Sequence, residues 1–157
     1  MLTVADLVIE PAPVLSRPAE LVVRFDEELR TLAEKMLRVL PHLNGVGLAA
    51  PQIGIGRRLF VIGAAGVQGA FTNPRIIERS EPYHPVEGCL SVPGQLYTPL
   101  RHQRITAAWQ DLDGTFREGR LEGLLAEIFE HETDHLDGVL LHQRPQFPAG
   151  DPGTGVR

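Results

Sequence analysis

The chain has 157 residues, a formal net charge of −5 and a hydrophobic fraction of 43%. This length suits one domain with its own core, and the composition excludes a wholly disordered chain. The acidic balance and the scattered arginines disfavour direct binding of nucleic acid. A single cysteine excludes an internal disulfide. Because neither a signal peptide nor a bilayer-spanning apolar stretch is evident, we expect a cytoplasmic protein without membrane contact.

The first third of the chain predicts an extended arm followed by a helix and a glycine loop. Three prolines favour an extended course for residues 1–20. Asp26 is a typical N-cap, and apolar residues recur at steps of three and four over residues 26–40, as in an amphipathic helix. The closely spaced glycines of residues 44–56 predict a loop whose backbone closely approaches another group.

The middle of the chain predicts strands joined by hairpin turns. Residues 59–62 are apolar throughout and predict a buried strand, and residues 76–77 mark another short one. Ile105, Ala107 and Trp109 alternate with polar residues, which is typical of a half-buried strand. The Asp-Gly pair at residues 113–114 then predicts a hairpin turn.

The last part of the chain predicts a second helix and a tail. Residues 121–137 favour the helix, and Gly138 is a typical residue to end it. Residues 145–157 are rich in proline and glycine, which predicts disorder there and leaves residues 1–144 as a single domain. The order helix, strands, helix predicts an α+β fold, with antiparallel β-sheets packed around the second helix and an N-terminal helix beside them.

The segment His131-Glu132-Thr133-Asp134-His135 lies in the second predicted helix. Residues four apart share a helix face, so both imidazoles can reach one metal ion, with Glu132 placed to handle the attacking water. The apolar face through Leu124 and Ile128 continues onto the histidines and directs them inward. The alternative of two surface histidines spaced by chance is much weaker for this five-residue pattern. The second helix is therefore predicted to be the central metal-binding helix.

Two histidines do not complete a catalytic metal site, which needs a third protein ligand and an open position. His142 lies beyond the end of the predicted helix. A better candidate is Cys89 in the segment Glu87-Gly88-Cys89-Leu90-Ser91-Val92-Pro93, because a thiolate is a good ligand for iron or zinc. A lone cysteine is more often a buried filler, but the incomplete two-histidine site favours the ligand.

The third informative segment is Gly45-Val46-Gly47-Leu48-Ala49-Ala50-Pro51-Gln52-Ile53-Gly54. It lacks the Gly-Lys-Ser/Thr of a phosphate-binding loop, so nucleotide binding is not expected. By itself this segment is typical of a structural turn with one polar side chain, Gln52.

Together the three segments resemble the three motifs of the peptide deformylase family, in the family's order. The resemblance runs from about Pro13 through Arg144. It implies a metal-dependent hydrolase that removes the N-formyl group from the N-terminal formylmethionine of newly made polypeptides and releases formate. N-formylmethionyl peptides would be its substrates. The ribosome is a further partner that the resemblance raises.

The resemblance assigns chemical roles to six positions. Cys89, His131 and His135 would bind the metal, and Glu132 would be the general base and acid. Gln52 and the backbone N–H of Leu90 would stabilise the developing oxyanion. One divalent ion per chain is implied, most commonly Fe²⁺ in such families. The residue types alone leave Zn²⁺ and other divalent ions open.

Further positions would contact the substrate. The resemblance implies that Val46 and Gly47 pair with the substrate backbone as an added strand, and that Ile128 and Phe129 line the methionine pocket. Glu87 is assigned to the substrate side of the site, and it is also expected to form a buried pair with Arg101 that braces the Cys89 segment.

Several positions depart from the family pattern. Glu130 replaces a usual Gln, Glu127 a common Arg, and Leu96 an Arg near the pocket mouth, and a long C-terminal helix found in some members is not evident. These departures bear on substrate range and ribosome docking. Two other functions share part of the pattern, namely a metallopeptidase of the His-Glu-x-x-His type and a non-catalytic paralogue that binds formylated peptides.

Overall fold

The computed structural model describes residues 1–147, which form a mixed α/β fold with antiparallel sheets and two α-helices. The helices are α1 (Glu27–Val39) and α2 (Gly123–Leu136). The strands are β1 (Gly47–Ala49), β2 (Leu59–Ala64), β3 (Val67–Tyr83), β4 (Glu87–Cys89), β5 (Val92–Tyr97), β6 (Arg101–Gln110) and β7 (Phe116–Glu122). The predicted α+β class is confirmed.

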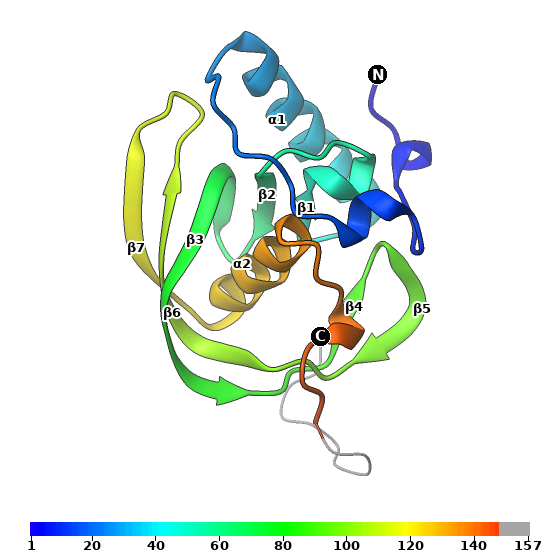
Figure 1. The fold of residues 1–157 in the computed structure, drawn as a ribbon, viewed down its shortest axis with the longest axis vertical. Coiled ribbons are helices and arrows are strands. Elements are labelled where there is room, and N and C mark those ends of the chain that lie inside the picture. The colour runs from blue at the N-terminus through cyan, green and yellow to red at the C-terminus, as the bar shows by residue number, and fades with distance from the viewer. Residues whose placement is uncertain (148–157) are drawn as a thin grey trace.

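Five of these strands form one antiparallel sheet in the order β1-β2-β3-β6-β7, and β4 and β5 form a separate hairpin. Figure 1 shows the larger sheet curving around α2, with α1 packed beyond β1 and β2. In this order β1 is an edge strand of the large sheet and pairs within that sheet with β2 alone.

Helix α1 forms where the sequence predicts it. The carboxylate of Asp26 caps the helix by accepting a 3.1 Å hydrogen bond from the N–H of Leu29. Two acidic residues in the first turn complement the helix dipole. One face is buried against the sheet at a spacing of three and four residues: Leu29, Ala33, Met36 and Val39. The arm before α1 is less extended than predicted, because it contains short 3₁₀ turns at Val4–Asp6 and Pro13–Ser16.

Strand β2 is buried on both faces, as its uniformly apolar sequence predicts. Leu59 and Val61 belong to the apolar cluster under α1, whereas Phe60 and Ile62 belong to the cluster under α2. This division follows from the two-residue period of a strand. The sheet therefore separates two cores at this end of the molecule and holds α2 against one of its faces.

Strand β3 is far longer than the short segment predicted at residues 76–77. Its pairing with β6 contains register shifts between Thr72 and Arg75 and between Ile76 and Glu78. Bulges of this kind bend a strand and increase its twist, which suits the curved sheet in Figure 1. Much of the second half of β3 is exposed, so its sequence lacks the alternation of apolar and polar residues that predicts a strand.

Helix α2 begins two residues later than predicted. Leu121 and Glu122 belong to β7 and pair with β6. Gly123 then turns the chain into the helix with φ +59°, a conformation that glycine adopts without strain. The predicted stop at Gly138 is confirmed, because this residue has φ +74° and donates a hydrogen bond to the carbonyl of His135.

The predicted tail is wrong where it overlaps the described chain. The carbonyl of Pro145 accepts a 2.9 Å hydrogen bond from the N–H of Leu100, and the N–H of Phe147 donates to the carbonyl of Thr98. Residues 145–147 are thus tied to the segment between β5 and β6. The rest of the predicted tail, residues 148–157, lies outside the described residues.

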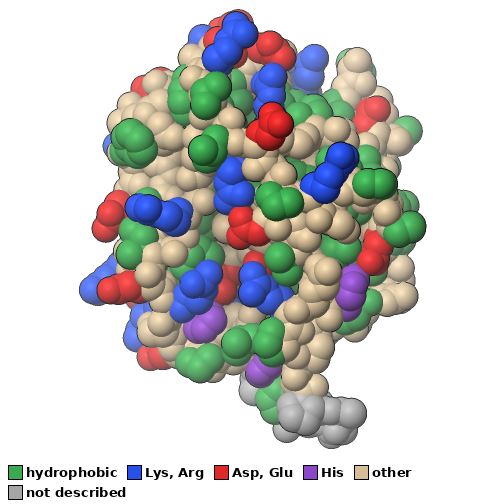
Figure 2. All heavy atoms as spheres, in the orientation of Figure 1, with side chains coloured by type: hydrophobic (Ala, Val, Ile, Leu, Met, Phe, Trp, Pro, Cys, Tyr) green, Lys and Arg blue, Asp and Glu red, His purple; other side chains and the backbone are tan. Residues whose placement is uncertain are grey.

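On the face shown in Figure 2, acidic and basic side chains are interspersed over the surface and do not form one basic patch. None of the helices within residues 1–147 has the length and apolar character needed to cross a bilayer.

Candidate metal centre and its cavity

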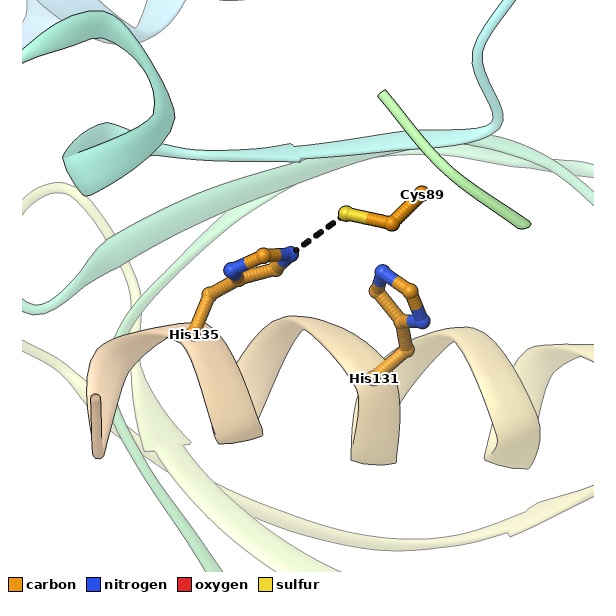
Figure 3. Close-up of side chains that lie close together, drawn as sticks. All are labelled: Cys89, His131 and His135. Atoms are coloured by element: carbon orange, nitrogen blue, oxygen red, sulfur yellow. Dashed lines mark hydrogen bonds between the residues drawn. The ribbon is translucent and has the colours of Figure 1, made fainter. Parts of the chain in front are cut away.

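Helix α2 directs two imidazole rings to the same point. His131 and His135 are one turn apart on one face, and their ring centroids are 5.1 Å apart. Figure 3 shows both rings directed toward Cys89 on β4. His135 is 2% exposed, and its burial lowers the pKa of the ring well below the usual value. The neutral imidazole favoured by this burial is the form that binds metal ions.

Cys89 completes the cluster from the opposite side. It ends β4, and the tight turn at residues 90–91 returns the chain as β5, with Cys89 opposite Val92. Its Sγ lies 3.2 Å from Nε2 of His135, and one ligand atom from each of the three residues lies within 4.8 Å of the others. The sequence prediction that these residues come together is correct, and the donor set fits zinc or iron.

Glu87 orients one of the histidines. Its Oε1 lies 2.7 Å from Nδ1 of His131, which leaves Nε2 of that ring for an ion. Arg101 donates to both Glu87 oxygens, at 2.9 and 3.1 Å, and is 1% exposed. Burial would raise the pKa of Glu87, but the neighbouring His131 and Arg101 outweigh it and lower that pKa to about 2. The expected Glu87–Arg101 pair therefore exists, and it extends to a candidate ligand.

The buried charges continue beyond this pair. Arg101 also donates a 2.7 Å hydrogen bond to Asp134, which lies on α2 between the two histidines. Asp134 accepts a further 3.0 Å hydrogen bond from Arg144, beyond the end of α2. Sequence reasoning missed Asp134 and Arg144. Their partners are distant in the chain, so only the fold reveals that alternating charges link the Cys89 hairpin to α2.

Glu132 lies beside the three candidate ligands and against β1. It is 3% exposed, and its Oε1 is buried with no hydrogen-bond partner within residues 1–147. A Cβ added to Gly47 would lie 2.7 Å from Oε2 of Glu132, so only glycine fits on β1 at this point. Burial raises the pKa of Glu132 to about 7. A carboxyl group with such a pKa can both accept and return a proton near neutral pH.

Gln52 joins the glycine segment to the Cys89 hairpin. Its Oε1 accepts a 2.9 Å hydrogen bond from the N–H of Ala49, and its Nε2 donates to Oγ of Ser91 at 3.3 Å. The same Nε2 lies 3.8 Å from Sγ of Cys89. The Gln52 side chain is 1% exposed and is therefore enclosed by protein rather than open to solvent.

These side chains open onto a cavity of about 720 Å³, a volume typical of ligand sites. It brings together most of the residues that the sequence assigns to catalysis or substrate contact. The lining residues are Asn44, Gly45, Val46, Gly47, Gln52, Glu87, Gly88, Cys89, Leu90, Pro93, Leu124, Glu127, Ile128, His131 and Glu132. Asn44, Pro93 and Glu127 were not predicted as site residues. Leu124 could have been, since it lies one turn before Ile128 on the same helix face.

The assignment of Phe129 to the pocket wall is wrong. Phe129 is fully buried among aromatic rings, with its ring centroid 5.0 Å from that of Phe60 and 5.5 Å from that of Phe71. Successive helix residues point about 100° apart, so Ile128 can line the cavity only while Phe129 faces the core behind it.

The sequence and the fold are similar to those of known proteins. A family model described as polypeptide deformylase matches residues 4–148. A peptide deformylase of Thermotoga neapolitana is 44% identical over 133 residues, covering 84% of this chain and 81% of the relative. The crystal structure of the Thermotoga maritima peptide deformylase superposes with a TM-score of 0.85 at 41% identity, over 88% of this chain and 95% of that one. A peptide deformylase from Synechococcus elongatus in complex with actinonin gives 0.84 at 37% identity, over 88% and 77%. The chain belongs to the polypeptide deformylase family.

Proposed function

We propose that this chain is a metal-dependent hydrolase that removes the formyl group from N-formylmethionyl peptides and releases formate. The observation that carries the proposal is the convergence of Cys89, His131 and His135 beside the buried carboxyl of Glu132, next to a substrate-sized cavity. Family membership supports the same reaction.

The three converging residues would hold one divalent ion, which makes α2 the central metal-binding helix. We take Fe²⁺ as the native ion, with Zn²⁺ as the alternative that the same donors accept. Such an ion supplies Lewis-acid chemistry, because it lowers the pKa of water and polarises a carbonyl oxygen. Glu87 supports this assignment by fixing the tautomer of His131 through its 2.7 Å contact with Nδ1.

Glu132 is proposed as the general base and then the general acid. It would take a proton from the attacking water and later give a proton to the amine that leaves. Two observations support the role, namely the raised pKa of about 7 and the buried Oε1 without a partner among the described residues. General acid–base catalysis of this kind typically contributes about 10²–10⁴ in rate.

Gln52 and the backbone N–H of Leu90 are proposed to meet the negative charge that develops on the formyl oxygen. The Gln52 Nε2 is 3.8 Å from Sγ of Cys89, and Leu90 follows Cys89 directly in the chain, so both donors lie beside the candidate metal centre. A hydrogen-bond donor in such a position is typically worth about 3–4 kcal/mol of the reaction barrier.

The substrate backbone is proposed to lie along β1. This strand is an edge of the large sheet and pairs with β2 on one side only. Val46 and Gly47 both line the cavity, so an extended peptide could add to the sheet there. Ile128 would contact the methionine side chain. Glu87 also lines the cavity, although its carboxylate is engaged by Arg101 and His131.

A cytoplasmic location, where new polypeptides are made, is part of this proposal. Docking to the ribosome is a further expectation that rests on the substrate alone.

The test is release of formate from formyl-Met-Ala, measured beside cleavage of an unformylated peptide. We expect formate from the first and no cleavage of the second, which a metallopeptidase would cut. Glu132→Gln should keep the metal but lower turnover by about 10²–10⁴, because glutamine cannot accept the proton. Tight binding of the formylated peptide without formate would instead indicate a non-catalytic paralogue.

A further inference from the structure

The N-terminal arm makes two backbone hydrogen bonds to segments that surround the candidate metal centre. The N–H of Val8 donates to the carbonyl of Gln52 at 2.7 Å, and the N–H of Glu10 donates to the carbonyl of Ser91 at 2.9 Å. Figure 1 draws the arm in dark blue, beside the hairpin of β4 and β5. Residues 8–10 thus join the glycine segment to the Cys89 hairpin.

The two residues that accept these bonds also contact each other through their side chains. Nε2 of Gln52 donates to Oγ of Ser91 at 3.3 Å, and both residues are almost fully buried. Gln52 is therefore held at both ends, with its carbonyl bound by the arm and its amide bound within the site. Because a buried polar group is costly to leave without a partner, these contacts hold one another in place.

The arm is itself anchored to the fold on either side of Val8. Leu2 and Leu7 pack against the apolar cluster under α1. After Val8, Glu10 is bound to Ser91 through its N–H, and its carboxylate lies 3.6 Å from Nε2 of His142, beyond the end of α2. The N–H of Val8 therefore approaches Gln52 from a fixed support.

We propose that Val8 is a positioning residue for Gln52, through the hydrogen bond from its backbone N–H. The inference rests on the proposed function, in which the Gln52 amide meets the charge that develops on the formyl oxygen. Val8 is not among the residues within 1–147 that line the cavity, so it acts through Gln52 and not on the substrate. A donor of this kind lowers the barrier only when its geometry is closely held, so loss of the support should slow the reaction more than it weakens binding.

Val8→Pro removes the supporting donor, because proline has no backbone N–H. Formate release from formyl-Met-Ala is measured per folded, metal-loaded molecule. We expect kcat to fall about tenfold while KM changes less than about twofold. An ester bond in place of the peptide bond between Leu7 and Val8 removes the same donor and keeps the valine side chain. It should lower kcat equally, and it supplies the measurement if the proline variant does not fold.

A Gln52→Leu background separates positioning from general damage. In that background either change at Val8 should lower kcat by less than about twofold more, because the group that Val8 positions is already gone. A fall by the same factor in both backgrounds would show that Val8 does not act through Gln52, and it would overturn the inference.

Val4→Pro is the matched control. Val4 is the first residue of a 3₁₀ turn in the same arm, a position where proline is tolerated, and it is 50% exposed. This variant should keep the kcat of the unaltered protein. Unchanged kcat in the Val8 variants would overturn the inference, while formate release by the unaltered protein still supported the proposed function. No formate from the unaltered, metal-loaded protein would overturn both.

Discussion

Gln52 contacts both the glycine segment that carries it and the candidate metal centre. The oxygen of its amide accepts a hydrogen bond from the N–H of Ala49, and the nitrogen lies near Cys89 and Ser91. A role in fixing the loop and a role at the formyl oxygen are therefore compatible, because they use opposite ends of the same amide. Substitution should affect both stability and catalysis.

Gln52→Leu should lower the melting temperature by about 3–8 °C, since it leaves a buried N–H unpaired at a cost of about 1–3 kcal/mol. Turnover per folded molecule should fall by about 10²–10³ with a modest change in KM, because the donor acts mainly on the transition state. Thermal melting and single-turnover rates on the same sample measure the two effects. If turnover per folded molecule stayed at the level of the unaltered protein, Gln52 would serve the loop alone.

At the scale of elements, β1 and α2 meet where Gly47 faces Glu132. A methyl group at Gly47 would overlap the carboxyl group, at 2.7 Å from Oε2 and 3.0 Å from Cγ. Gly47→Ala should therefore displace Glu132 and lower kcat by about 10²-fold, because small misplacements of a catalytic group are costly. Metal content should not change, since Gly47 is not among the three converging ligands.

Gly69→Ala is the matched control for this substitution. Gly69 lies on β3 in the same sheet, and a Cβ there would meet nothing within 4 Å. We expect near-normal turnover and unchanged or slightly higher stability from this variant. Equal turnover in the two alanine variants would show that the β1–α2 contact does not position Glu132.

The buried charges between the Cys89 hairpin and α2 form the second link between elements. Arg101→Met would leave Glu87 and Asp134 buried without their shared partner, which should cost about 3–5 kcal/mol of stability. Metal affinity should fall by about 10–100-fold as Glu87 loses its support beside His131. Competition with a chelator measures that affinity.

The control for Arg101 is Arg104→Met. Arg104 pairs with Glu81 and Glu122, but its side chain is 56% exposed, and such pairs are worth at most about 1 kcal/mol. Metal affinity should be unaffected by this variant. An Arg101→Met protein that held metal as tightly as the Arg104→Met protein would rule out a supporting role for the buried charges.

Sequence reasoning predicted the elements that repeat a local pattern and missed those that depend on distant partners. The helix α1 follows from the spacing of its apolar residues, and the strand at residues 59–62 follows from its uninterrupted apolar run. The length of β3 depends on pairing with β6, and the start of α2 depends on how far β7 continues to pair. Local periodicity carries no information about where such pairing ends.

The same limit applies within the site. The ligands were predictable because their residue types and spacing are specific to metal chemistry. The family resemblance assigns both Ile128 and Phe129 to the methionine pocket, yet the helix turns Phe129 into the aromatic core. The sequence does not mark Asp134 or Arg144 as site residues, because a carboxylate and a guanidinium in isolation are more often solvated surface groups.

At the scale of the whole molecule, the fold brings three separate segments together beside the cavity. The edge strand β1 supplies Gly47, the short hairpin of β4 and β5 supplies Cys89, and α2 supplies the two histidines and Glu132. The curved sheet fixes α2 from behind, and the buried charges tie the hairpin to it. The proposed chemistry therefore requires the intact fold together with one ion in the Cys89–His131–His135 cluster.

The most direct test of this account measures formate release from formyl-Met-Ala. A chelator first strips the protein of metal, and Fe²⁺ is then added in the absence of oxygen. The rate should rise in proportion to added ion and reach a plateau at one ion per chain. Cys89→Ala should show no such rise at the same concentrations, because the cluster has lost its thiolate ligand. Full formate release by the stripped protein, or an equal rise and plateau in Cys89→Ala, would contradict the account.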